Sequence, residues 1–126
     1  MSETATAASY VQKAEQVIET LAKSRNLATD TQLRKIFSLS NRILSRLEAQ
    51  GISKTAKLEG EQMALLYSLQ VQIVYQSARM PNVKFFVQRT GLLEQLKRVS
   101  TLGQFIDFHR YLEALTAYQK FYTTMR

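Results

Sequence analysis

The sequence lacks several residue types that particular folds and chemistries require. It contains no cysteine, one proline, one histidine and four glycines among 126 residues. The absence of cysteine excludes disulfides, thiol catalysis and cysteine-ligated metal sites, and it favours an intracellular protein. So few proline and glycine residues cannot supply the turns that an all-β fold of this length needs. The composition therefore favours a helical protein.

Motifs for catalysis and cofactor binding are also missing. The sequence has no phosphate-binding P-loop, no dinucleotide-binding glycine pattern and no nucleophile elbow. Asp107 and Glu113 lie about 120° apart on their predicted helix, so they do not form a carboxylate pair. We expect His109 to be a surface or half-buried side chain and not a general base. The sequence thus predicts no enzymatic activity, no cofactor, no metal and no small-molecule substrate.

No segment of the sequence predicts contact with a membrane. The N-terminal stretch MSETATAASY has neither the basic start nor the apolar centre of a secretory signal. The longest uncharged run, from Gln62 to Ala78, contains four glutamines and is too short and too polar to span a bilayer. We therefore expect a cytoplasmic location.

Apolar residues recur at helical spacing along the chain and predict about five helices. The expected bounds are residues 9–24, 31–50, 58–79, 82–98, and from 100 or 101 to 122. Thr29 or Asp30 would cap the second helix and Gly51 would end it. Pro81 would separate the third helix from the fourth, and Gly91 is a weak point inside the fourth. The predicted layout is a disordered N-terminal tail, residues 1–8, followed by a single compact all-α bundle, residues 9–126.

Two of these predicted helices are apolar on two sides. On the third, Leu65, Leu69 and Ile73 lie on one side and Tyr67, Val71 and Val74 on another. On the last, a core stripe that includes Tyr118 is accompanied by Ile106, Ala117 and Phe121 on a second side. A helix of this kind is either central in its fold or docks against a second surface. We expect part of this apolar surface to contact a neighbouring chain.

Positive charge is concentrated in two blocks of the sequence. The chain has 17 Lys and Arg against 10 Asp and Glu, a net charge of +7. The first block, LRKIFSLSNRILSRL at residues 33–47, carries Arg34, Lys35, Arg42 and Arg46 and no carboxylate. At about 100° per residue these four side chains fall within an arc of about 120°, opposite the apolar residues of the same helix. We call these four residues the basic stripe, and we expect them to face outward together.

The simplest interpretation of the basic stripe is a solvated helix face. Like charges one or two turns apart repel each other, however, and this helix offers no acid before Glu48. Such a stripe is tolerated more readily when an anion lies across it, and an arginine can bind two phosphate oxygens at once. We therefore predict that the stripe contacts a phosphate backbone.

The second basic block, ARMPNVKFFVQR at residues 78–89, contains Arg79, Lys84 and Arg89. These three residues are further candidates for phosphate contacts. The neighbouring Phe85 and Phe86 are expected to be core residues, although a stacking role for one of them is an alternative.

Three segments of the chain, in this order, are typical of one known family. They are YVQKAEQVI at residues 10–18, TQLRKIFSLSNRI at 31–43, and QIVYQSARMPNVKFFV at 72–87 leading into FIDFHRYLEALTAYQKFY at 105–122. With them the chain resembles the small subunit of type III-A CRISPR effector complexes, the Csm-type ribonucleoproteins. The most specific part is the ending, which matches the family pattern YxEALxAYxKFY from Tyr111 to Tyr122. The family more often has histidine where Gln119 stands and Gly-Gly where Thr123 and Thr124 follow, and neither change alters a charge.

The resemblance implies a function as well as a fold. Small subunits of this family are compact helical bundles without catalytic activity, and several copies stack head to tail along the complex. Their basic faces contact the backbone of the crRNA–target RNA duplex, while other subunits cut RNA and make signalling nucleotides. The implied partners are RNA, other subunits and copies of the same chain. The implied RNA-binding residues are the basic stripe together with Arg79, Lys84 and Arg89.

Two other functions are compatible with the residues alone. One is a free-standing small helical nucleic-acid-binding protein, although we find no helix-turn-helix spacing. The other is a protein–protein adaptor whose basic residues meet an acidic protein surface. Binding to RNA that weakens with salt would favour a phosphate partner over the adaptor.

Overall fold

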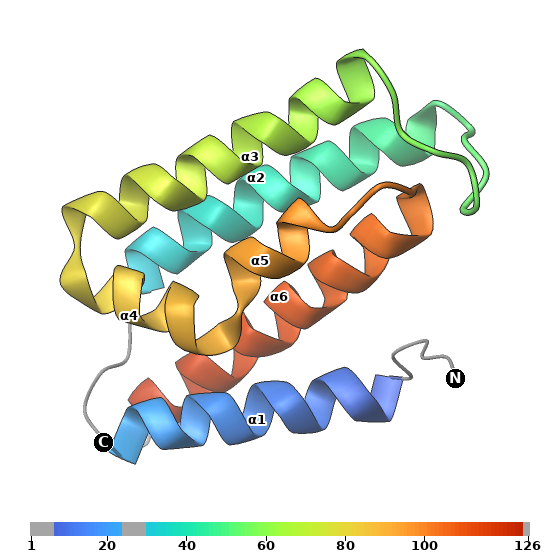
Figure 1. Cartoon of the computed structure of the whole chain (residues 1–126). Helices are drawn as coiled ribbons and strands as arrows, with labels where there is room; N and C mark the ends of the chain where they lie inside the picture. The colour runs from blue at the N-terminus through green and yellow to red at the C-terminus, as the bar shows by residue number, and fades with distance from the viewer. Residues whose placement is uncertain (1–6, 24–29, 125–126) are drawn as a thin grey trace.

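The structure describes residues 7–23 and 30–124, and the helical spacing of the apolar residues corresponds to helices over most of these two ranges. The computed structural model contains six helices in these two ranges (Figure 1). They are α1 (Ala7–Lys23), α2 (Asp30–Ala49), α3 (Glu61–Arg79), α4 (Pro81–Thr90), α5 (Leu92–Lys97) and α6 (Leu102–Thr124). The predicted all-α fold is confirmed. Thr29 and the first six residues of the predicted tail lie outside the described residues. Ala7 and Ala8, which the prediction assigned to that tail, are the first residues of α1, and the division into tail and domain otherwise stays a prediction.

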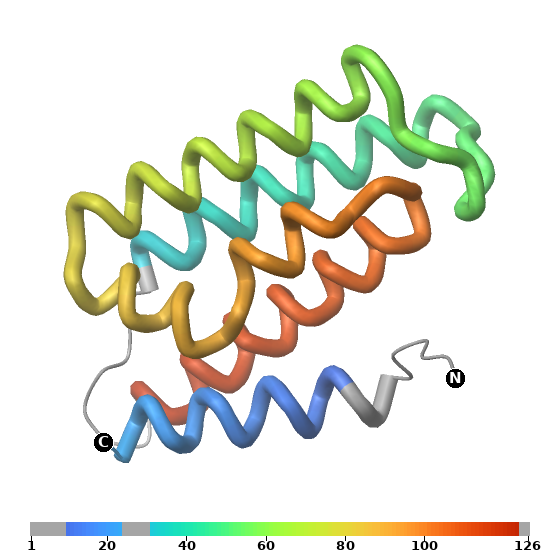
Figure 2. The backbone as a smooth tube through the Cα atoms, in the orientation of Figure 1, coloured from blue at the N-terminus to red at the C-terminus, as the bar shows by residue number. Residues whose placement is uncertain are grey.

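Helix α6 is the central element of the bundle. It packs against α1, α2 and α5, while α3 packs against α2, α4 and α5. The α2 and α3 helices run antiparallel beside each other, and α4 and α5 lead the chain back toward the start of α6 (Figures 1 and 2). As a result α3 lies at one edge of the bundle and α1 at the opposite edge.

The predicted fourth helix is in fact two helices, α4 and α5, so the single span 82–98 is wrong. Gly91 has a φ of 70°, in the left-handed region that ends a helix and that glycine adopts without steric cost. The other two expected breaks are confirmed: Gly51 also has a φ of 70°, and Met80 before Pro81 is extended, at φ −128° and ψ 116°. The third helix begins at Glu61 and not at Leu58.

The core is built from large side chains of every helix and is richest along α6. Phe105, Phe108 and Tyr111 are fully buried there, and Phe86 of α4 joins them. The Tyr111 hydroxyl donates a hydrogen bond of 2.9 Å to the carbonyl oxygen of Thr90, at the end of α4. Burial raises the pKa of Tyr111 to about 12, because the phenolate would lose its hydration. Tyr118, predicted as a core residue, is only partly buried.

His109 links α6 to α2 inside the bundle. It is 6% exposed, so the prediction of a surface or half-buried histidine is wrong. Its Nδ1 forms a hydrogen bond of 2.8 Å with the buried Ser40 hydroxyl, and its ring stacks on Phe37 with centroids 5.1 Å apart. Burial lowers the pKa of His109, and the nearby Glu113 and Glu48 carboxylates oppose this effect. These contacts fix which side of α2 faces inward, and therefore which side remains outside.

Candidate nucleic-acid interface

The four residues of the basic stripe lie on the outer side of α2. Each of these side chains is exposed. The opposite side of the helix is buried through Leu33, Ile36, Ile43 and Leu47. The helical periodicity therefore placed these side chains correctly, and the packing of α2 against α3 and α6 keeps them outward.

Three of the four stripe residues line one groove between α2 and α3. The groove has a volume of about 360 Å³ and is lined by Thr31, Arg34, Lys35, Ser38, Leu39, Arg42 and Gln72. All of these except Gln72 come from α2, and Gln72 comes from α3. Arg46 lies one turn beyond Arg42 and does not line the groove. We call this depression the α2–α3 groove. It combines three cations with hydroxyl and amide groups that can donate hydrogen bonds to oxyanions.

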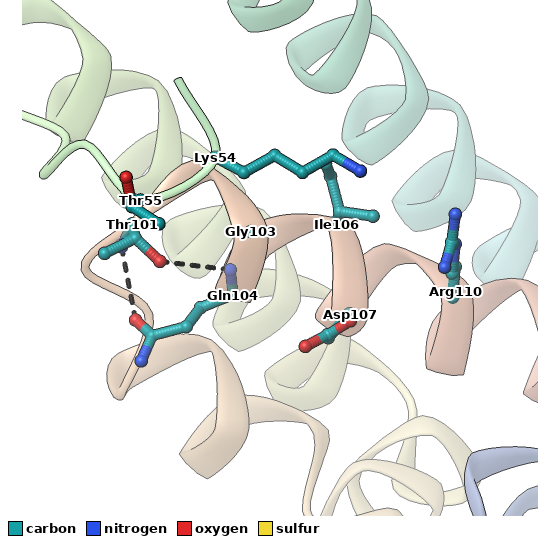
Figure 3. A pocket seen from close by; sticks show the side chains of 8 residues that line it. All are labelled: Lys54, Thr55, Thr101, Gly103, Gln104, Ile106, Asp107 and Arg110. Atoms are coloured by element: carbon teal, nitrogen blue, oxygen red, sulfur yellow. Dashed lines mark hydrogen bonds between the residues drawn. The ribbon is translucent and has the colours of Figure 1, made fainter. Parts of the chain in front are cut away.

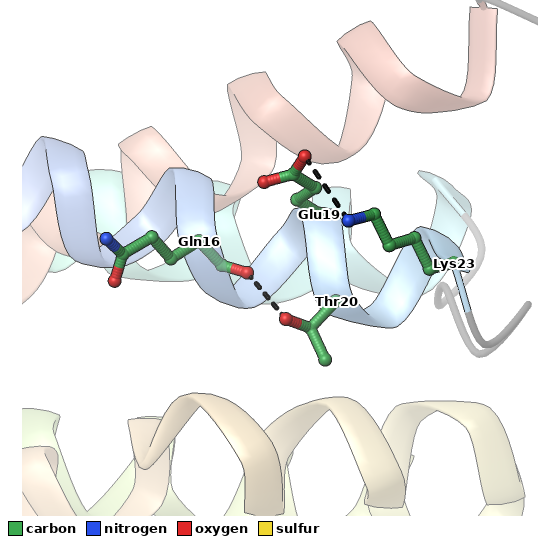
Figure 4. Close-up of polar contacts among 4 residues, drawn as sticks. All are labelled: Gln16, Glu19, Thr20 and Lys23. Atoms are coloured by element: carbon green, nitrogen blue, oxygen red, sulfur yellow. Dashed lines mark hydrogen bonds and ion pairs between the residues drawn. The ribbon is translucent and has the colours of Figure 1, made fainter.

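The cations of the α2–α3 groove are not neutralised by carboxylates of the described chain. The ion pairs of Lys23 with Glu19 at 3.8 Å and of Lys97 with Glu94 at 4.0 Å lie on other helices of the described chain. Figure 4 shows the first of these along one side of α1, together with the hydrogen bond from the Thr20 hydroxyl to the carbonyl oxygen of Gln16. The groove therefore presents charge that an external anion can neutralise.

The second basic block does not join this groove. Arg79 ends α3 and lies over the Tyr75 ring, 5.6 Å from its centroid. Arg89 of α4 lies over the half-buried Phe85 ring, 5.0 Å from its centroid, and borders a different groove against α1. Lys84 is exposed on α4. These three side chains are available to solvent, but they are spread around the end of the bundle.

The two phenylalanines of this block have different surroundings. Phe86 is fully buried, as expected of a core residue. Phe85 is partly buried beneath the Arg89 guanidinium. An arginine over an aromatic ring is an attractive cation–π contact. Phe85 therefore serves to position Arg89, and its ring face is already occupied.

A further basic depression, which sequence reasoning missed, lies where the loop after α2 meets the start of α6 (Figure 3). It has a volume of about 450 Å³ and is lined by Lys54, Thr55, Thr101, Gly103, Gln104, Ile106, Asp107 and Arg110. The loop is held there by a hydrogen bond of 2.9 Å from the Gly103 amide to the Lys54 carbonyl oxygen. Lys54 and Arg110 are distant in sequence, so only the fold brings them to one site. Asp107 reduces the positive charge of this depression.

Two other classes of site find no support in the part of the chain that the structure describes. In residues 7–23 and 30–124, no three His, Asp or Glu side chains gather in a way that could hold a metal ion. None of the described helices combines the length and the apolar character that a membrane-spanning helix needs.

Comparison with known proteins identifies the family. Residues 4–125 match the family described as Csm2 Type III-A. The CRISPR system Cms protein Csm2 of Streptococcus thermophilus is 38% identical over 116 residues, which is 90% of this chain and 90% of the relative. The Csm2 protein of Mycobacterium tuberculosis (strain CDC 1551 / Oshkosh) is 39% identical over 115 residues, 89% of this chain and 90% of the relative. That of Enterococcus italicus is 32% identical over 100 residues, 77% of this chain and 69% of the relative. As the resemblance predicted, the chain belongs to the Csm2 family of type III-A CRISPR small subunits.

Proposed function

We propose that this chain is a non-catalytic, cytoplasmic subunit that binds RNA along its phosphate backbone within the type III-A effector complex. The observation that carries the proposal is the α2–α3 groove. Arg34, Lys35 and Arg42 gather there without an ion pair to any carboxylate of the described chain. Ordinary surface cations are more often interspersed with acids, whereas clustered cations on one helix side are typical of a phosphate-binding surface.

The groove suits a phosphate strand better than a base edge. Each guanidinium can bind two oxygens of one phosphate, and the Ser38 and Thr31 hydroxyls can donate to others. Phosphate contacts hold a nucleic acid without selecting its sequence. A guided complex needs this property, because pairing between guide and target already determines the sequence.

The remaining predicted contacts extend the surface beyond the groove. Arg46 continues the stripe by one turn of α2. Arg79 is the last residue of α3, and Lys84 and Arg89 lie on α4. We propose that these four bind phosphates outside the groove. We also propose that exposed apolar side chains meet other subunits of the complex and further copies of this chain.

The test removes two groove cations together. The double variant Arg34→Ala/Arg42→Ala should bind short unstructured RNA about tenfold more weakly at low salt, to a similar extent for every sequence. The slope of log affinity against log salt concentration should become shallower by about 1.4, since each lost phosphate contact on a single strand contributes about 0.7. Fluorescence anisotropy over a salt series measures both quantities.

The matched control is Lys23→Ala/Lys97→Ala, which also removes two positive charges. Both lysines are paired with acids on other surfaces, so RNA affinity should change much less. The thermal midpoint should be nearly unchanged in both double variants, because exposed substitutions of this kind alter the free energy of unfolding by at most about 0.5 kcal/mol. Equal RNA binding by the two variants, or a salt slope near zero in the unmodified chain, would refute the phosphate-binding role.

A further inference from the structure

The two walls of the α2–α3 groove differ in chemical character. The α2 wall supplies three cations of the basic stripe, whereas the α3 wall supplies Gln72. No charged residue occurs from Gln62 to Ala78, so α3 adds no charge to the groove along this stretch. The two helices run antiparallel beside each other (Figures 1 and 2). A strand in the groove would therefore meet cations from one helix and a neutral amide from the other.

The Gln72 side chain is held in one orientation by a second amide. Gln76, one turn further along α3, donates a hydrogen bond of 3.1 Å from its Nε2 to the Oε1 of Gln72. Gln76 is 3% exposed, and a side chain packed this closely has little freedom to change its rotamer. The bond occupies the carbonyl oxygen of Gln72. Its amide nitrogen, with two N–H donors, is left for a ligand of the groove.

The reverse orientation of the two amides would be less favourable. The Oε1 of Gln76 is buried and has no hydrogen-bond partner among the described residues. Turning both amides over would put the Nε2 of Gln76 in that place, where two N–H donors instead of one carbonyl oxygen would lack partners. Each buried donor without a partner destabilises the fold. Gln72 therefore faces a ligand of the groove as a hydrogen-bond donor.

A neutral donor beside a row of cations suits a sugar hydroxyl better than a phosphate. The charged groups of α2 attract the phosphates more strongly than an amide does, and a strand bound in this way has its riboses next to the bound phosphates. The 2′-hydroxyl of a ribose can accept a hydrogen bond, whereas deoxyribose has no such group. Contact with a base edge would instead introduce a sequence preference, which a guided complex does not need.

We propose that Gln72 is a specificity-determining residue, which donates from its Nε2 to a ribose 2′-hydroxyl and so makes the α2–α3 groove prefer RNA over DNA. Gln76 is a positioning residue, because it holds the Gln72 amide in the donating orientation. The inference rests on the proposed binding of phosphates by this groove, since the phosphate contacts bring the ribose to Gln72.

The test compares two matched oligonucleotides by fluorescence anisotropy at one salt concentration. The RNA and the DNA have the same short unstructured sequence, with deoxyuridine in the DNA, so that only the 2′-hydroxyls differ. The unmodified chain should bind the RNA about threefold to tenfold more tightly, which is the gain expected of one neutral hydrogen bond. Gln72→Ala should bind the RNA more weakly by this factor and the DNA with unchanged affinity.

Two further variants separate the contact from the fold. Gln76→Met keeps a long unbranched side chain in the core but removes the donor that holds Gln72. Its preference for RNA should fall, while its affinity for DNA should stay the same. The control Gln70→Ala truncates another half-buried glutamine of α3, one that does not line the groove, and should leave both affinities unchanged. Circular dichroism should show the same helix content in all the variants.

The outcomes distinguish this inference from the proposed function. Equal affinity of the unmodified chain for RNA and DNA, with both weakened in Arg34→Ala/Arg42→Ala, would overturn the ribose contact and leave phosphate binding in place. A Gln72→Ala variant that keeps the full preference, or that loses RNA and DNA equally, would overturn it too. A loss confined to some sequences would assign Gln72 to a base edge and overturn the inference. A full preference in Gln76→Met would overturn the positioning role. An unmodified chain that binds neither nucleic acid would refute both proposals.

Discussion

At the scale of single residues, the buried His109 makes the stability of the fold depend on pH. Burial lowers the pKa of His109 in the folded state. Below the ordinary value of 6.5, the imidazole is therefore protonated more readily in the unfolded chain than in the folded chain. The contribution of His109 is therefore fully present above pH 6.5 and is lost as the pH falls. We expect the free energy of unfolding by urea to decrease from pH 7.5 to pH 5.5 more steeply in the unmodified chain than in His109→Gln. The Glu113 carboxylate on α6 and the Glu48 carboxylate on α2 are present in both proteins, so the difference isolates the histidine. Identical pH dependence in the two would contradict this assignment.

The same residue shows what periodicity can and cannot predict. The outward orientation of Arg34 and Arg42 follows from the α2 sequence alone, because the apolar residues of one helix determine its buried side. The burial of His109 depends instead on where α2 crosses α6, since Phe37 and Ser40 supply its contacts from a distant part of the chain. Tyr118 was expected in the core because it belongs to an apolar stripe of its helix. Its partial exposure depends on neighbouring elements, which the α6 sequence does not specify.

At the scale of elements, the break between α4 and α5 depends on the backbone of Gly91. Its φ of 70° lies in the left-handed region, and a Cβ added there would meet no atom within 4 Å. The cost of Gly91→Ala is therefore conformational and not steric, and we expect the free energy of unfolding to fall by about 1–2 kcal/mol. Gly91→Asn should lose less, because asparagine adopts this region more readily. Urea denaturation of both variants measures the difference. An alanine variant as stable as the unmodified chain would contradict this conformational cost.

The break was visible in the sequence only as a weak point. Apolar residues continue at helical spacing on both sides of Gly91, so the pattern predicts one helix through Arg98. One contact that supports the break comes from elsewhere in the fold, because the Thr90 carbonyl oxygen accepts the hydrogen bond of Tyr111. A second contact is local, since the Thr90 hydroxyl accepts a hydrogen bond of 3.3 Å from the Leu92 amide. A tertiary and a local contact thus support a turn that Gly91 permits.

At the scale of the whole molecule, the basic residues are grouped by packing and not by their order in the chain. The first block becomes part of a groove only because Gln72 of α3 lies beside it. The second block, also contiguous in sequence, is divided between the end of α3 and a surface near α1. Lys54 and Arg110, far apart in sequence, share one depression. Charge clustering in the sequence therefore predicts which residues are exposed cations, but their grouping into sites requires the arrangement of the helices.

The separation of the groove from the apolar surfaces leads to a prediction about assembly. If the α2–α3 groove binds RNA, and other subunits meet other parts of the surface, removing the groove cations should leave assembly intact. We expect a tagged copy of the chain to purify from cells with a crRNA and the other subunits of the effector complex. Arg34→Ala/Arg42→Ala should recover the same subunits in the same proportions, since the groove contains a single apolar lining residue, Leu39. The purified variant complex should then retain labelled target RNA less well as salt is raised, because fewer phosphates are neutralised. Loss of the protein subunits from the variant, with unchanged target retention by whatever complex remains, would assign the groove to a protein partner instead.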